Sequence, residues 1–386
     1  MIDPQLASFA TVRQLELMEA AEKHGSMRKA ATALGLSHSY ISRSMKALKR
    51  KAARQGYAPE HDMTRTVPDG FKVRGVSTYY NAEGKAAGQW VKSTADHERQ
   101  LELMQEALEA LREEIPTATP VDAPSHSLTA LCNVYTLTDC HVGMLAWHRE
   151  GGADWDLAIA EKTLVGCFSA MVQSSPQAET CVIAQLGDFL HYDSAVAAIT
   201  PVHGHNLDAD GRMPKMVRTA IRILRTVVQA ALERHQRVIL LLAEGNHDMG
   251  SSVWLRAMFS ALYEAEPRVY VIDSELPYYV HQHGKTMIGW HHGHLSKNDA
   301  LPLLFAAQFP QVWGSTSRRY VHCGHRHHVA EKEHPGMTVV QHPTIAARDA
   351  YAARGGWLSE RQVQAITYHS EHGQVARNIV TPEMLQ

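Results

Sequence analysis

The sequence predicts a small helical module at the N-terminus, followed by a larger α/β domain. Three short helical patterns separated by glycines lie within residues 12–54. A stretch rich in proline, alanine and threonine over residues 116–124 is typical of a linker between domains. From residue 129 onward, short apolar runs alternate with longer segments of helical periodicity, and this alternation indicates an α/β fold.

Composition limits the class of protein. At 386 residues the chain has room for one large domain and a smaller appendage. Its formal net charge of −2 is too close to neutral to indicate a partner, so the distribution of charge matters more. The five cysteines are scattered and odd in number, and without a signal peptide they predict a reducing, cytoplasmic location. No apolar stretch is long enough to cross a bilayer, so we expect no membrane association.

The N-terminal helical patterns fit a helix-turn-helix. They cover residues 12–24, 26–34 and 38–54, and Gly25 and Gly35 end the first two. We expect Ser37 or Ser39 to cap the third helix, and Ala30 with Ala31 to allow close packing between helices. The small core would contain Leu36, Ile41 and Leu48. The pattern resembles a helix-turn-helix of the winged type.

Charge favours a nucleic-acid role for the third helix, which carries basic side chains and no acidic one. The basic residues are Arg43, Lys46, Lys49, Arg50, Lys51 and Arg54. Because like charges on one helix repel each other, the phosphates of DNA would stabilise it. We expect DNA contacts from Ser39, Arg43, Lys46, Lys49 and Arg50, with Ser37, His38 and Ser42 also near the bases. The alternative is the solvated face of a helical bundle or an oligomerisation module.

A β-hairpin is predicted after these helices, over residues 71–80 and 88–92, joined through residues 81–84. It carries four basic side chains, Lys72, Arg74, Lys85 and Lys92. They would contact a phosphate backbone as a wing does, or the hairpin would simply cover the helices.

Residues 95–115 predict a further helix, with apolar side chains at steps of three and four. It would act as a spacer or join two chains as a homodimer. We therefore divide the chain into three parts. They are a DNA-binding domain of residues 1–93, a helix with a proline-rich linker of residues 94–127, and a large domain of residues 128–386.

Polar side chains follow five predicted strands, at the point where each strand ends. The first strand, residues 134–138, leads into Asp139 and His141, and alternate residues of an extended segment point the same way, so both could grip one ion. The later motifs are Gly187-Asp188-Phe189-Leu190-His191, Gly245-Asn246-His247-Asp248, His291-His292-Gly293-His294 and Gly324-His325-Arg326-His327. One such motif alone is more often a cap or a surface turn, but five in succession favour a metal site. The glycines before Asp188, Asn246 and His325 fit turns in which the backbone passes close to an ion or a phosphate.

These five motifs resemble those of the calcineurin-like metallophosphoesterases, and the resemblance extends over about residues 129–341. It implies a four-layer α/β/β/α sandwich, in which two mixed sheets pack together and helices flank them. The predicted helices cover residues 155–172, 212–235, 253–265 and 301–308. Strands over residues 337–341 and 364–369 are expected to complete the second sheet.

The resemblance also implies two metal ions that share one carboxylate. Asp139, His141, Asp188 and His327 would hold one ion, and Asp188, Asn246, His292 and His325 the other. His294 is the alternative to His292. Carboxylate, amide and imidazole ligands suit manganese, iron or zinc better than calcium or copper. We expect Mn²⁺, with iron, zinc or magnesium as alternatives.

Such a centre implies hydrolysis of a phosphoester. His247 would protonate the leaving group, oriented by Asp248, and His191 is the second candidate for this role. Many phosphatases of the family carry Asp where this chain has His191, whereas the SbcD-type double-strand-break-repair nucleases tend to carry His. The resemblance is therefore closest to that branch, although Asp193 could stand in for the missing acid.

The expected function is a two-metal-dependent phosphodiesterase, specifically a DNA nuclease that its N-terminal module brings to DNA. One alternative is a phosphatase or phosphodiesterase acting on nucleotides or other small phosphoesters. Another is a DNA-binding regulator whose phosphoesterase domain senses a ligand. The loop of residues 200–211 would face substrate or form an ordinary surface loop, and we expect neither His203 nor His205 to bind metal.

Overall fold

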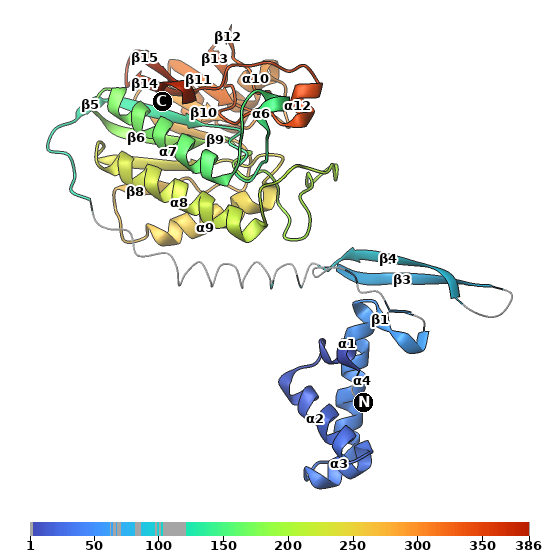
Figure 1. Cartoon of the computed structure of the whole chain (residues 1–386). Coiled ribbons are helices and arrows are strands. Elements are labelled where there is room, and N and C mark those ends of the chain that lie inside the picture. The colour runs from blue at the N-terminus through green and yellow to red at the C-terminus, as the bar shows by residue number, and fades with distance from the viewer. Residues whose placement is uncertain are drawn as a thin grey trace. The chain divides into compact units, whose positions relative to one another are not determined.

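The computed structural model describes residues 3–61, 63–64, 67, 71–81, 86–96, 99, 102 and 121–385. The chain forms two compact units, Met1–Ala110 and Leu111–Gln386 (Figure 1). Each unit has its own core. Among the helices described, none is both long enough and apolar enough to span a membrane.

The first unit contains the predicted helix-turn-helix. Its helices are α1 (Pro4–Ala7), α2 (Val12–Lys23), α3 (Met27–Ala33) and α4 (His38–Arg54). Ser37 caps α4 by accepting a hydrogen bond from the backbone N–H of Tyr40. Leu17, Ala30, Ala31 and Ile41 form the buried core, so the small alanine side chains bring the helices together as predicted.

The predicted hairpin follows, and its second strand is longer than expected. After β1 (Tyr57–Ala58), the 3-10 turn η1 (Pro59–His61) and β2 (Met63–Thr64), strands β3 (Phe71–Tyr80) and β4 (Ala86–Ala95) pair antiparallel. Ala95, the predicted start of a helix, is the last residue of β4. Most of the predicted helix of residues 95–115, and Lys85 of the hairpin, lie outside the described residues. Dimerisation through that segment stays a prediction.

The second unit is built on two mixed sheets that pack face to face, as the four-layer prediction requires. The six-stranded sheet has the order β15-β14-β5-β6-β7-β8. Its strands are β5 (Leu128–Leu137), β6 (Ala178–Gln185), β7 (Arg237–Leu242), β8 (Val269–Val271), β14 (Val363–His369) and β15 (Gly373–Val380). The five-stranded sheet has the order β12-β13-β11-β10-β9. Its strands are β9 (Tyr279–His283), β10 (Thr286–Trp290), β11 (Arg318–Cys323), β12 (Ala330–His334) and β13 (Met337–Gln341).

Apolar side chains from both sheets meet in one core. Val134, Val182 and Ile239 come from the first sheet, and Ile288 and Trp290 come from the second. Burial on both faces explains why the middle of β6, residues 181–184, and all of β7 after Arg237 are continuously apolar rather than alternating.

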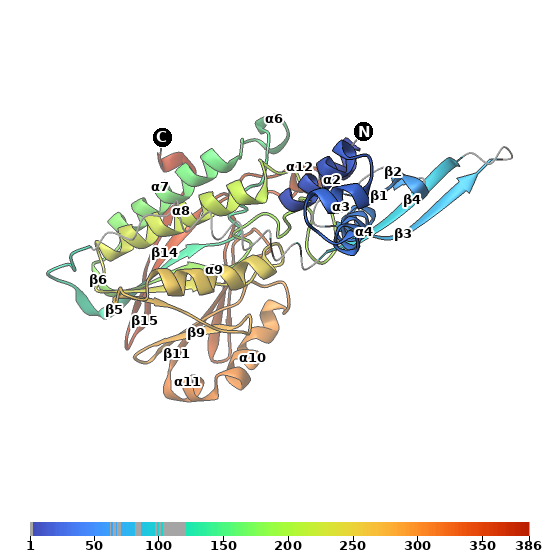
Figure 2. The ribbon, with the colours of Figure 1, turned by 90° about the horizontal axis from the view of Figure 1, so that it is seen from below.

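Helices form the two outer layers (Figure 2). Helices α7 (Leu157–Ser174), α8 (Met213–Leu232) and α9 (Met249–Leu262) cover the six-stranded sheet. Helices α10 (Leu301–Gln308) and α11 (Pro310–Ser315) cover the five-stranded sheet, and Phe305 of α10 packs against Met287 and Val321. The short elements α6 (His148–Gly151), η2 (Asn298–Ala300), α12 (Ala350–Arg354) and η3 (Pro382–Leu385) lie in connections or at the end of the unit.

The strand of residues 364–369 was predicted in the second sheet but lies in the first. Residues 337–341 join the second sheet, where β13 runs parallel to β11. Residues 364–369 were expected beside them, but β14 pairs antiparallel with β5 in the first sheet, placing Ile366 opposite Val134. The cause is the β14–β15 hairpin, which extends the free edge of β5 and adds Ile366 to the core between the sheets.

Parallel pairing positions the functional residues. Strands β5, β6 and β7 run parallel, so their carboxyl ends meet at one edge of the first sheet. In the second sheet β10 and β11 are likewise parallel. The loops that follow these five strands are the ones that carry the polar motifs.

Candidate metal centre

The five loops bring the predicted ligands into two adjacent groups. One group contains Asp139, His141 and His327, and the other contains Asp188, His292 and His325. Within each group, the potential donor atoms all lie within 4.8 Å of one another. These sets have the composition that a divalent cation needs, with carboxylate and imidazole donors in a buried place.

In the first group, Nε2 of His327 lies 3.0 Å from Oδ1 of Asp139, and Nε2 of His141 lies 3.5 Å from Nε2 of His327. Asp139 is fully buried. Its carboxylate also accepts hydrogen bonds from the backbone N–H of His325 and the hydroxyl of Thr138. These contacts fix the orientation of the carboxylate.

In the second group, Nε2 of His292 lies 3.1 Å from Oδ2 of Asp188 and 3.2 Å from Oδ1 of Asn246. The other ring nitrogen of His292 donates to the carbonyl of Leu186 at 2.9 Å, which leaves Nε2 to face the oxygens. This geometry favours His292 over His294 as a ligand. His294 belongs to none of the metal-binding groups found among the described residues.

Asp188 connects the two groups. Its Oδ1 accepts the backbone N–H of His247 at 2.8 Å, and its carboxylate is 2% exposed. Burial acts to raise the pKa of Asp188, but His292 most strongly, and then His247 and His141, hold that pKa well below its usual range. Asp188 interacts electrostatically with imidazoles on both sides, His292 in the second group and His141 in the first. This is the position expected of a carboxylate that two ions share.

The backbone at the site is strained. The non-glycine residues of the described chain with positive φ are Asp139, His141, Asp188, His325 and His327, with φ between 42° and 68°. All of them are predicted ligands. Residues are held in this conformation only where surrounding structure imposes it, and such positions cluster at functional sites.

The left-handed backbone explains how Asp139 and His141 converge, and the explanation differs from the one predicted. Asp139 and His141 do not converge because an extended strand points alternate side chains the same way. β5 ends at Leu137, and left-handed turns at φ 51° and 42° bring the two side chains together instead.

Two of the motif glycines pack closely against predicted ligands, while their predicted approach to an ion or a phosphate stays a prediction. A Cβ atom on Gly245 would collide with both the backbone and the carboxylate of Asp188. A Cβ atom on Gly324 would collide with Thr138 and Asp139. At both places the neighbour is a ligand or supports one, so glycine keeps the loops packed against the site.

The charges fit bound cations. Burial acts to raise the pKa of Asp139, but His327 outweighs it and the pKa is lowered. Burial would lower the pKa of His292, yet Asp188 raises it to about 9, and Asp139 likewise raises the pKa of His327. Protons on these imidazoles balance the buried carboxylates, and cations with the same ligands would take over that balance.

His191 and His247 lie beside the first group. Together with His141 they form a third cluster whose nitrogens lie within 4.8 Å of one another. Nδ1 of His247 donates to the carbonyl of His191 at 2.7 Å, so the second ring nitrogen of His247 is free for another role. Nε2 of His191 is buried and lacks a hydrogen-bond partner among the described residues.

The prediction that Asp248 orients His247 is corrected by these contacts. The carboxylate of Asp248 accepts hydrogen bonds from the backbone N–H groups of Asp188, Phe189, Leu190 and Gly245. It therefore holds the loop after β6 against the loop after β7. The ring of His247 is oriented instead by the carbonyl oxygen of His191.

Asp193 does not stand in for the acid that His191 replaces. Its carboxylate accepts hydrogen bonds from the backbone of Gly250 and Ser251 and from the hydroxyl of Ser251, at the start of α9. The carboxylate of Asp193 therefore stabilises the N-terminus of α9. The rings of His203 and His205 stack at the surface with centroids 5.6 Å apart, and neither belongs to a possible metal-binding group within the part of the chain that the structure describes.

Some supporting residues could not be found from the sequence. The hydroxyl of Thr344 donates to the carbonyl of Asp139 at 2.7 Å, across 205 positions of the chain. The hydroxyl of Thr138 donates to the carboxylate of Asp139. A hydroxyl that contacts a distant backbone leaves no pattern in sequence, although the position of Thr138 directly before Asp139 was a usable signal.

The predicted DNA-binding residues lie in the first unit. Ser39, Arg43, Lys46, Lys49 and Arg50 are all exposed on α4. Arg43 donates from Nε to the carbonyl of Ser39, and Lys49 forms an exposed ion pair with Glu60 at 3.0 Å. These side chains are accessible to a ligand from solvent, but their geometry does not assign one.

Residues 12–55 match the lysR family of bacterial regulatory helix-turn-helix proteins. The match agrees with the fold of the first unit. No significant match is found among curated proteins.

Several solved structures are similar to this chain at low identity. A conserved uncharacterised protein of Streptococcus pneumoniae TIGR4, a predicted phosphoesterase, is 11% identical over 66% of this chain and 92% of its own, with a TM-score of 0.30. Vps29 of Entamoeba histolytica complexed with Zn²⁺ is 14% identical, over 65% and 99%, with a TM-score of 0.26. Phosphopantetheinyl hydrolase of Mycobacterium tuberculosis is 11% identical, over 60% and 94%, with a TM-score of 0.26. At such scores the likenesses carry no weight for function, which has to be inferred from the site.

Proposed function

We propose that residues 128–386 form a two-metal-dependent phosphodiesterase and that its substrate is DNA. The observation that carries the proposal is the pair of adjacent oxygen and nitrogen donor groups connected by Asp188. A strained backbone at five of the ligands supports it, because a purely structural site gives no reason to maintain such strain.

Asp139, His141, Asp188 and His327 would hold one ion, and Asp188, Asn246, His292 and His325 the other. When bound, the ions would stabilise charge on phosphoryl oxygens and lower the pKa of an attacking water. Manganese is our first choice of metal, with iron, zinc and magnesium as alternatives.

His247 is our candidate proton donor to the leaving group. One ring nitrogen is fixed by the carbonyl of His191, and the ring centroid lies 4.8 Å from that of His141. The second nitrogen is thereby held beside the donor groups at a constant angle. Asp248 contributes by fixing the two loops that carry Asp188 and His247.

The N-terminal unit supports DNA as substrate. Helix α4 exposes its basic side chains, and its segment matches a DNA-regulatory helix-turn-helix family. His191 at the last place of the motif Gly187-Asp188-Phe189-Leu190-His191 agrees with an SbcD-type nuclease. We therefore propose residues 1–93 as the module that brings the enzyme to DNA.

The test uses the full chain, Mn²⁺, and single- and double-stranded DNA, with Asp188→Asn as the inactive control. We expect metal-dependent cleavage that the control lacks. If metal binds but no DNA form is cleaved, the nuclease proposal is wrong. Rapid hydrolysis of nucleotides or nitrophenyl phosphoesters in that case would support the small-substrate alternative.

A further inference from the structure

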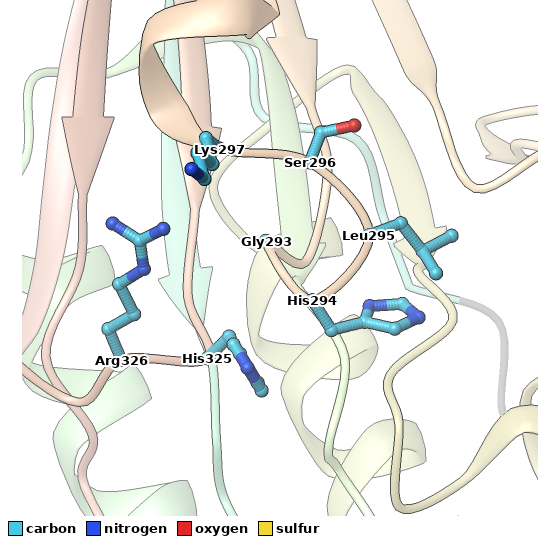
Figure 3. Close-up of a pocket in the computed structure, with 7 residues that line it drawn as sticks. All are labelled: Gly293, His294, Leu295, Ser296, Lys297, His325 and Arg326. Carbon is cyan, nitrogen blue, oxygen red and sulfur yellow. The ribbon is translucent and has the colours of Figure 1, made fainter. Parts of the chain in front are cut away.

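A pocket of about 260 Å³ opens directly beside the second donor group (Figure 3). Two loops line it, the one after β10 and the one after β11. The lining residues are Gly293, His294, Leu295, Ser296, Lys297, His325 and Arg326. His325, a predicted metal ligand, is thus also part of the pocket wall.

The pocket has a cationic side. Figure 3 shows the amine of Lys297 and the guanidinium of Arg326 on the same side, whereas the rings of His294 and His325 point away from them. Both basic side chains are exposed, and neither forms an ion pair with another of the described residues. The nearby Asp299 is paired with Lys332 at 2.8 Å, and the charge of Arg326 contributes only weakly to the lowered pKa of Asp299, after Lys332 and His334.

Hydrogen bonds hold the two loops in a fixed relation. Asn298, next to Lys297, donates to the side chain of Gln341 at 3.1 Å, and Gln341 in turn donates to the carbonyl of Gly324. The N–H of Gly324 donates to the carbonyl of His292 at 2.8 Å. Lys297 and Arg326 are therefore carried by loops that are tied to each other and to a metal ligand.

His294 adds a polar group without a partner. Both its ring nitrogens are buried and lack hydrogen-bond partners among the described residues. Its ring centroid lies 5.3 Å from that of His292 and 6.2 Å from that of His325. A buried polar atom left unpaired costs stability, and here it lies between the pocket wall and two predicted metal ligands.

We propose that this pocket binds a second, non-reacting phosphate of the substrate, adjacent to the phosphodiester at the metal centre. The planar guanidinium of Arg326 would donate two hydrogen bonds to two phosphate oxygens, while the ammonium of Lys297 would contribute a positive charge. This inference rests on the proposed function and narrows it. The preferred substrate would carry neighbouring phosphates, as a polynucleotide strand does, rather than one isolated phosphoester.

The experiment compares the thymidine dinucleotide TpT, which has one phosphate, with the trinucleotide TpTpT, in which either scissile phosphate has a neighbour. Arg326→Ala and Lys297→Ala are tested in the full chain with Mn²⁺. Lys285→Ala is the matched control, because Lys285 is exposed at the opposite end of β10 from the site. We expect each pocket variant to raise KM for TpTpT about tenfold, with little change for TpT or in the control.

Equal effects on both substrates, or no effect on TpTpT, would overturn the pocket proposal. Binding of TpT and TpTpT to Asp188→Asn, with and without Arg326→Ala, tests the same point without turnover. A preference of Asp188→Asn for TpTpT that Arg326→Ala removes would support the pocket, and equal affinities would refute it. If the wild type binds TpTpT through Arg326 but cleaves neither substrate, the proposed catalytic function fails while the pocket stands.

Discussion

The metal centre and helix α4 are both rich in polar residues, but they differ in how tightly their side chains are held. At the centre, Asp139 and Asp188 are buried, and backbone N–H groups and imidazoles fix them. On α4, the basic side chains extend into solvent. A fixed arrangement narrows the possible chemistry to a few reactions, whereas an exposed basic face indicates a class of ligand without naming one.

The largest expected effect separates the two regions by function. Asp188→Asn removes the charge shared by both donor groups, so hydrolysis of any phosphodiester should fall by more than about 10⁴-fold. DNA binding by the N-terminal unit should be unchanged. Steady-state rates and fluorescence anisotropy measure the two properties on one preparation. A large loss of DNA affinity would contradict the separation.

His247→Ala is expected to have the next largest effect, and it depends on the leaving group. Cleavage of DNA releases a poor leaving group that needs a proton, and its kcat should fall roughly 10²- to 10³-fold. Esters that release p-nitrophenolate need little protonation and should be affected far less. Equal losses on both substrates would mean that His247 has another role, such as binding metal.

Substitutions on α4 should weaken DNA binding and leave hydrolysis unchanged. Arg43→Ala combined with Lys46→Ala should weaken DNA binding about tenfold or more at low salt. The slope of log affinity against log salt concentration should become shallower by about 0.9 for each phosphate that the variant no longer neutralises. Hydrolysis of nitrophenyl esters should not change. If affinity and salt slope remain those of the wild type, α4 is a solvated face and the N-terminal unit serves another purpose.

The core of the second unit lies away from both regions, and the effect expected there is on stability rather than on hydrolysis or DNA binding. His235 is buried, its Nδ1 donates to the carbonyl of Ala178, and its Nε2 accepts from the hydroxyl of Tyr135. Burial lowers the pKa of His235 to about 4. As pH falls from about 6.5 to 4, the unfolded chain gains a proton that the folded chain does not, so stability drops by roughly 3 kcal/mol.

His235→Gln keeps one hydrogen-bond donor group and one acceptor on the side chain and cannot titrate, so the unfolding free energy should depend less on pH between 6.5 and 4. Denaturant titrations at several pH values measure this, with His203→Gln on the exposed loop as control. An unchanged pH dependence would show that His235 is not a source of acid sensitivity.

The sequence predicted well those features that local patterns determine. Helices α2, α3 and α4 begin and end within about a turn of the expected positions because Gly25, Gly35 and Ser37 mark their ends. Loop motifs after parallel strands were brought together as expected, since parallel strands deliver their carboxyl ends to one edge.

Features that depend on tertiary context were not predictable. β14 joined the first sheet because of its pairing with β5, and β-strand pattern alone does not choose a partner. Asp248 follows His247 directly, yet its contacts go to backbone groups of residues about 60 positions away. Lys297 and Arg326 share a pocket only because two loops are tied together through Gln341.

The most direct test of the central claim is the metal content of the full chain after incubation with Mn²⁺ and removal of free metal. Inductively coupled plasma mass spectrometry gives the ratio of metal to protein. We predict two ions per chain in the wild type and one or fewer in Asp188→Asn, with Asp193→Asn unchanged as the control. A wild-type ratio near zero, or an equal ratio in Asp188→Asn, would contradict a binuclear centre that shares Asp188.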